Sequence, residues 1–130
     1  MIATPLYDGK VELDYMMSIF QTMEFCMLND IQMTLKTVVG CSLIGKARDE
    51  LFRLAYESEV DDLIFIDSDQ CWSQKDFGNL LSPTVDVIGG AVVSKNDNIH
   101  YNVKTFDKKY DFYYGLIDAR AVGRSEEHTS

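Results

Sequence analysis

A run of apolar residues, Leu63-Ile64-Phe65-Ile66, stands between Asp62 and Asp67. A run without polar alternation is typical of a strand that is buried on both faces of a parallel sheet. Parallel strands are joined by crossover connections, which are usually helices. The run therefore predicts an α/β domain in which helices cover both faces of a sheet.

Apolar periodicity in the rest of the chain agrees with this prediction. Strands are expected at residues 2–5, 33–39 and 86–93, and helices at 13–27, at 44–55 and between Ser73 and Pro83. Beyond Lys95 the period changes to two, and residues 99–103 and 110–114 predict an antiparallel hairpin. The expected fold is a three-layer, Rossmann-like α/β domain with a mostly parallel sheet, followed by this C-terminal hairpin.

The expected helices carry their own signals. We expect Ser42 to cap the second helix, and Ser73 and Asp76 to form a capping box at the start of the third. The first helix has a stripe of large apolar residues at helical spacing, which we expect to pack in the core. The stripe consists of Leu13, Met16, Met17, Phe20, Met23 and Met27.

Charge and composition exclude several classes of protein. The chain has 12 Lys and Arg against 21 Asp and Glu, a net charge of -9, so nucleic acid is not an expected partner. No apolar run approaches the roughly 20 residues that span a bilayer, and no secretory signal is visible, so we expect a cytoplasmic protein without a membrane segment. Cysteines without CxxC spacing disfavour a disulfide scaffold or a zinc site.

The last residues, 124–130, lack apolar periodicity and resemble the translation of a sequencing-library adapter. We expect them to be a non-native tail; a genuine polar C-terminus is the alternative. Residues 1–123 then form one domain, and we expect the native chain to continue beyond Gly123, which makes this sequence an amino-terminal fragment.

Asp67-Ser68-Asp69 follows the apolar run directly. Ligands of open α/β sheets bind outside the carboxyl ends of the strands, where these acids emerge. In an extended chain Asp67 and Asp69 share one side, with Cα atoms about 6.6 Å apart. Two such carboxylates suit Mg²⁺ or Mn²⁺, with waters and substrate phosphates completing the coordination. The alternative is that one acid caps a turn and the other is solvated.

The ordered segments resemble glycosyltransferases of the GT-A fold, in particular family-2-like members found in phage and environmental sequences. The resemblance covers residues 1–123 and rests on Thr4-Pro5, Ala47-Arg48-Asp49, the DxD with its strand, and Asp86-Val87-Ile88-Gly89-Gly90 with Lys95. It implies that this chain is the donor-binding half of a glycosyltransferase. Such a half binds a UDP- or GDP-linked sugar together with Mn²⁺ or Mg²⁺, for transfer to an unknown acceptor.

The resemblance also implies roles for single residues. Asp67 and Asp69 would be the metal ligands, Asp69 the more direct one. The donor nucleotide would be contacted by Thr4, Pro5, Tyr7, Arg48, Asp67, Ser68 and Lys95. Asp49 and Gln70 depart from the family pattern. The catalytic base would lie beyond Gly123, so we name none and expect this fragment to be inactive in transfer.

Two other functions stay open. A phosphohydrolase of the haloacid dehalogenase type also uses a DxD, with the first Asp as nucleophile, but generally on its first strand. A non-catalytic α/β binding module would keep Asp67 and Asp69 for structural reasons alone. Metal-independent folding without nucleotide affinity would select the binding module.

Deletion of residues 124–130 should leave the melting temperature unchanged within error, because this tail has no apolar side chains at a regular spacing to pack. Thermal unfolding of the chains 1–123 and 1–130 tests this expectation. A loss of several degrees would mean that the tail packs on the domain.

Overall fold

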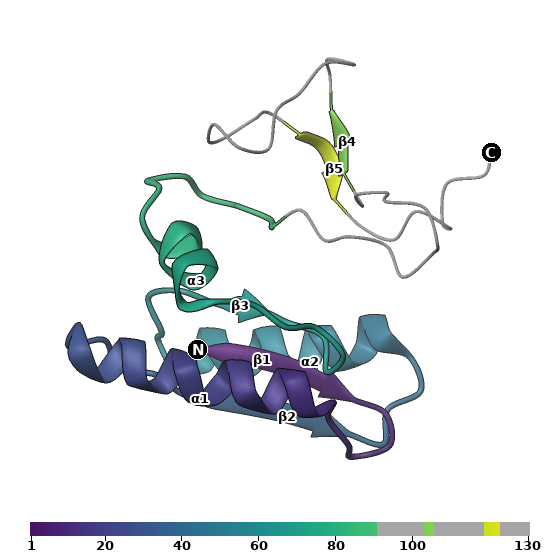
Figure 1. The fold of residues 1–130 in the computed structure, drawn as a ribbon. Helices are drawn as coiled ribbons and strands as arrows, with labels where there is room; N and C mark the ends of the chain where they lie inside the picture. The colour runs from purple at the N-terminus through teal and green to yellow at the C-terminus, as the bar shows by residue number, and fades with distance from the viewer. Residues whose placement is uncertain (91–102, 106–118, 123–130) are drawn as a thin grey trace, which may run out of the picture. The chain divides into compact units, whose positions relative to one another are not determined.

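The structure, a computed structural model, describes residues 1–90, 103–105 and 119–122. The chain divides into two compact units, Met1–Leu81 and Ser82–Ser130. Strands and helices alternate through the first unit, which confirms the predicted order of elements there (Figure 1). The elements are β1 (Ile2–Leu6), α1 (Leu13–Leu28), β2 (Leu35–Val39), α2 (Ile44–Glu57), β3 (Ile64–Phe65) and α3 (Gln74–Leu81).

The sheet of the first unit has three parallel strands in the order β2-β1-β3 within the described residues. β1 pairs with β2 along its whole length, from Ile2 opposite Leu35 to Leu6 opposite Val39. Its pairing with β3 is limited to Ile2 and Ala3. The predicted parallel α/β arrangement is therefore confirmed for this unit, and all three strands end at the same edge of the sheet.

Helices cover both faces of this sheet. In the view of Figure 1, α1 lies in front of the sheet and α2 behind it. On the α1 side, Ile2 of β1 packs with Tyr15 and Ile19. On the other side, α2 contacts β1 and β2 and buries residues at a spacing of four, which line up on one face of a helix: Ala47, Leu51 and Ala55. These contacts produce three layers.

α1 buries a different face from the one that the sequence predicted. Its buried residues are Tyr15, Ser18, Ile19, Thr22 and Cys26. The residues of the predicted stripe are exposed, from 39% at Met16 to 78% at Met27. The prediction that the stripe packs in the core is wrong. Apolar spacing alone does not predict burial of Ser18 and Thr22, because both are polar. They can be buried because their hydroxyls have hydrogen-bond partners inside the unit.

Two strand predictions also need correction. The run at residues 63–66 forms only the short strand β3, and Phe65 is 39% exposed, because β3 is an edge of the described sheet. Residues 86–90 form no strand, and Val87 is 90% exposed; residues 91–93 lie outside the described part. An apolar run becomes a strand only where a neighbouring chain pairs with its backbone.

Of the two predicted helix caps, the structure corrects one and confirms the other. The residue at the N-cap of α2 is Leu43, without a side-chain cap, so the predicted Ser42 cap is wrong by one position. The capping box of α3 is confirmed. The Ser73 N–H donates to Asp76 Oδ2 at 3.1 Å, and the Asp76 N–H donates to Ser73 Oγ at 3.1 Å.

In the second unit, β4 (Val103–Thr105) pairs with β5 (Ala119–Val122) in antiparallel fashion, with Val103 opposite Val122. The predicted hairpin joined residues 99–103 to residues 110–114, and all of these except Val103 lie outside the described residues. Within the described part of the chain, no helix has the length and apolar character that crossing a membrane requires.

The buried face of α1 can be tested by truncating one residue on each face. Ile19→Ala should cost about 2–5 kcal/mol of unfolding free energy, because Ile19 is 7% exposed and its truncation leaves a cavity. Met17→Ala is the matched control and should cost less than about 1 kcal/mol, because Met17 is 50% exposed. Urea titrations measure both values. Equal losses of unfolding free energy in the two variants would mean that the apolar stripe is packed in the core after all.

Candidate functional site

The ends of the parallel strands meet at one edge of the first unit. The Gly40 N–H, just after β2, donates to the carbonyls of Leu6 and Tyr7 at 3.1 and 3.2 Å, and so joins the ends of β1 and β2. Gly40 has a φ of +80° and Gly9 a φ of +73°, left-handed values that favour glycine. The two glycines let both chains turn sharply away from the sheet at this edge.

The chain after β3 carries the predicted acids on a closed turn. The Gln70 N–H donates to the Asp67 carbonyl at 3.1 Å, and the Asp67 N–H donates to Gln70 Oε1 at 3.3 Å. We call residues 67–72 the acidic loop. Asp69 is exposed, and Asp67 is half-buried. The Gln70 side chain thus helps to close the turn that carries the two acids.

Arg48 of α2 reaches across to the acidic loop. Its Nη2 lies 3.3 Å from Asp67 Oδ1, with side-chain exposures of 44% and 29%. The family resemblance implied a nucleotide contact for both residues, and in the structure the two side chains form an ion pair with each other. Glu50, two residues further along α2, is paired with Arg53. In the described residues, a positive charge thus already lies beside one of the predicted metal ligands.

The residues of β1 and its exit take different positions. Thr4 is fully buried, and its hydroxyl is hydrogen-bonded to the Tyr15 hydroxyl. Burial raises the pKa of Tyr15 above its ordinary value. Pro5 is half-buried, whereas Tyr7 is 71% exposed just beyond the strand. Tyr7 is therefore the side chain of this set that is open to a ligand, and the Thr4 side chain belongs to the interior.

Ser68 and Lys95 complete the predicted set. The Ser68 carbonyl accepts a hydrogen bond of 3.0 Å from the N–H of Glu12, at the start of α1. This bond ties the middle of the acidic loop to the first helix. Lys95 lies outside the described residues.

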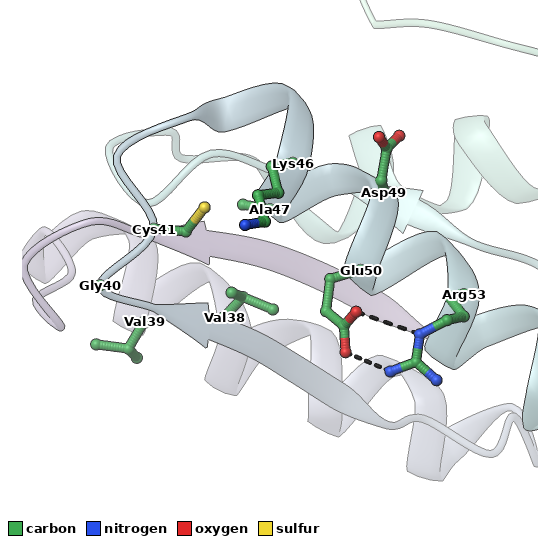
Figure 2. A pocket seen from close by; sticks show the side chains of 9 residues that line it. All are labelled: Val38, Val39, Gly40, Cys41, Lys46, Ala47, Asp49, Glu50 and Arg53. Atoms are coloured by element: carbon green, nitrogen blue, oxygen red, sulfur yellow. Dashed lines mark hydrogen bonds and ion pairs between the residues drawn. The ribbon is translucent and has the colours of Figure 1, made fainter.

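A pocket of about 540 Å³ lies between the end of β2 and the part of α2 from Lys46 to Arg53 (Figure 2). The sequence pattern gives no signal for this pocket, because its charged residues have the spacing of an ordinary solvated face of α2. The Arg53 guanidinium is bound by Glu50 and Glu57, and the contact with Arg53 lowers the pKa of Glu50. The lining residues are Val38, Val39, Gly40, Cys41, Lys46, Ala47, Asp49, Glu50 and Arg53.

The donor set for a cation at the acidic loop is small. In the described part of the chain, no group of three or more His, Cys, Asp or Glu side chains could hold a metal ion. Asp67 and Asp69 contribute two carboxylates. Hard cations such as Mg²⁺ and Mn²⁺ accept that number when water and phosphate oxygens supply the other ligands. The two acids lie on a turn and not on the extended chain from which their shared side was predicted, and two carboxylates would suffice only for a cation that brings phosphate and water ligands with it.

Comparison of this chain with protein-family models, curated proteins and solved structures found no match. The similarity to GT-A glycosyltransferases thus rests on the sequence segments named above, and the family stays a prediction.

Proposed function

We infer that the first unit is the donor-binding part of a metal-dependent glycosyltransferase. Asp67 and Asp69 hold Mn²⁺ or Mg²⁺ against the diphosphate of a UDP- or GDP-linked sugar, which is passed to an unknown acceptor. The observation that carries this proposal is the position of the acids. They lie on a turn after β3 in a parallel sheet, and ligands of such sheets bind beyond the carboxyl ends of the strands.

In this proposal each residue has a separate task. The cation stabilises the negative charge of the departing diphosphate. Arg48 balances Asp67 while the site is empty. When Asp67 turns to the cation, the planar guanidinium of Arg48 becomes available to bind phosphate oxygens in bidentate fashion. Tyr7 offers an exposed aromatic ring just beyond the end of β1, which the donor can contact.

We assign the nucleoside to the pocket beside β2. In the strand order β2-β1-β3, the ends of β2 and β3 lie two strand spacings apart across the sheet, about 10 Å, and β2 extends three residues further along β1 than β3 does. That separation suits a nucleoside at β2 whose diphosphate reaches the acids after β3. Lys46 and Asp49 in the pocket wall supply a hydrogen-bond donor and an acceptor for polar groups of the base and ribose.

Asp69→Asn should weaken the binding of UDP or GDP in the presence of Mn²⁺ by about ten- to a hundredfold, the size of a lost charge-assisted interaction of about 1–3 kcal/mol. The amide keeps the shape of the side chain and removes its charge. Asp61→Asn is the matched control, because Asp61 is an exposed acid before β3, at the opposite end of the strand. This variant should bind UDP or GDP with the affinity of the original chain. Calorimetric titration with and without Mn²⁺ measures the affinities.

Two outcomes of these titrations would contradict the proposal. Nucleotide binding that is equal in both variants and independent of Mn²⁺ would leave Asp67 and Asp69 as turn residues of a binding module. Release of phosphate from p-nitrophenyl phosphate that Asp67→Asn abolishes would instead favour the phosphohydrolase alternative.

Arg48→Gln should have opposite effects on two affinities. Binding of Mn²⁺ alone should strengthen up to about fivefold, because an exposed ion pair worth about 0.2–1 kcal/mol no longer competes for Asp67. Binding of UDP in saturating Mn²⁺ should weaken, because a phosphate contact is lost. Lys75→Gln on α3 removes the same charge elsewhere and controls for net charge. A weaker affinity for Mn²⁺ alone in Arg48→Gln would contradict the displacement of Arg48.

A further inference from the structure

The acidic loop ends in Trp72, and Trp72 is bonded to the buried face of α1. The Trp72 N–H donates to Ser18 Oγ at 3.0 Å, and the indole Nε1–H donates to Thr22 Oγ1 at 2.7 Å. Ser18 and Thr22 are 54 and 50 residues away in the chain, and both are buried. Two independent hydrogen bonds therefore fix one residue of the loop against one helix.

Both polar capacities of the Thr22 hydroxyl are used. The hydroxyl donates to the Ser18 carbonyl at 2.8 Å and accepts from the Trp72 indole. Its orientation is consequently fixed by two partners, one on α1 and one on the loop. The Tyr15 ring meets the Trp72 ring edge to face, with centroids 5.5 Å apart and planes at 75°. Rotation of the indole would break the hydrogen bond and this contact together.

α1 holds the acidic loop at two points along its length. The Glu12 N–H binds the Ser68 carbonyl between the two acids, and Ser18 and Thr22 bind Trp72 at the far end. The turn between Asp67 and Gln70 closes the loop internally. A shift of Trp72 is therefore transmitted to the acids through a short, hydrogen-bonded segment.

We propose that Ser18 and Thr22 are positioning residues for the acidic loop, and that through Trp72 they set where Asp67 and Asp69 present their carboxylates. The part of this inference that concerns ligands rests on the proposed function. Thr22 acts through Trp72 and touches neither cation nor nucleotide. A hydroxyl is required at position 22, whereas a side chain of the same shape without one would fill the space and leave the indole N–H without its partner.

The test compares Thr22→Val, which keeps the shape and removes the hydroxyl, with Thr22→Ser, which keeps the hydroxyl. Trp72 is the sole tryptophan of the chain, so its fluorescence reports on the loop directly. Thr22→Val should increase acrylamide quenching of Trp72 and weaken the Mn²⁺-dependent binding of UDP at least fivefold. Thr22→Ser should return both toward the values of the original chain. Thr37→Val, on exposed β2, is the control and should change neither.

The readouts separate the possible failures. Unchanged quenching in Thr22→Val would overturn the positioning of the loop. Increased quenching with unchanged UDP affinity would show that the loop moves without consequence for the acids, which also overturns the proposal. If the original chain itself fails to bind UDP with Mn²⁺, the proposed function falls. In that case, hydrogen exchange of the backbone amides of residues 67–70 tests the positioning of the acids without a ligand. If these amides are as well protected in Thr22→Val as in the original chain, the positioning of the acids is overturned.

Discussion

The arrangement of the first unit depends on two hydrogen bonds, which the buried hydroxyls of Ser18 and Thr22 accept from Trp72. A buried polar group that loses its partner costs about 1–3 kcal/mol, a large fraction of the stability of a small domain. The chain after β3 therefore cannot leave α1 without leaving donors and acceptors unpaired. Since β3 itself pairs at only two positions, these side-chain bonds do much of what a longer strand would do.

The same bonds explain which way α1 faces. A helix on a three-layer domain can give only one face to the sheet, and here that face carries Tyr15, Ser18 and Thr22. Each of these side chains has a hydrogen-bond partner: Tyr15 bonds to Thr4 on β1, and Ser18 and Thr22 bond to Trp72. Turning the apolar stripe of α1 inward would bury more carbon but would break all of these bonds. The face of α1 that makes these hydrogen bonds is buried, and the opposite face with Met17 and the rest of the apolar stripe is therefore exposed.

Sequence periodicity predicted the order of strands and helices because period depends on the local chain alone. It could not predict which face of α1 is buried, because hydroxyls such as those of Ser18 and Thr22 look solvent-facing until their partner 50 or more residues away is known. The position of Asp67 and Asp69 after a strand was predictable for the same local reason. The pairing of Asp67 with Arg48 was not, because it joins side chains from two different elements.

The ion pair between Arg48 and Asp67 has a strength that suits an exchangeable ligand. At 3.3 Å, with both side chains partly exposed, water screens the attraction, so that the pair contributes little to stability. A divalent cation carries twice the charge of the guanidinium and bonds directly to the carboxylate oxygens. On the proposed function, the pair is strong enough to reduce repulsion between the acids when the site is empty. It is also weak enough for the cation to displace Arg48, and the displaced guanidinium is then beside the phosphates that arrive with the cation.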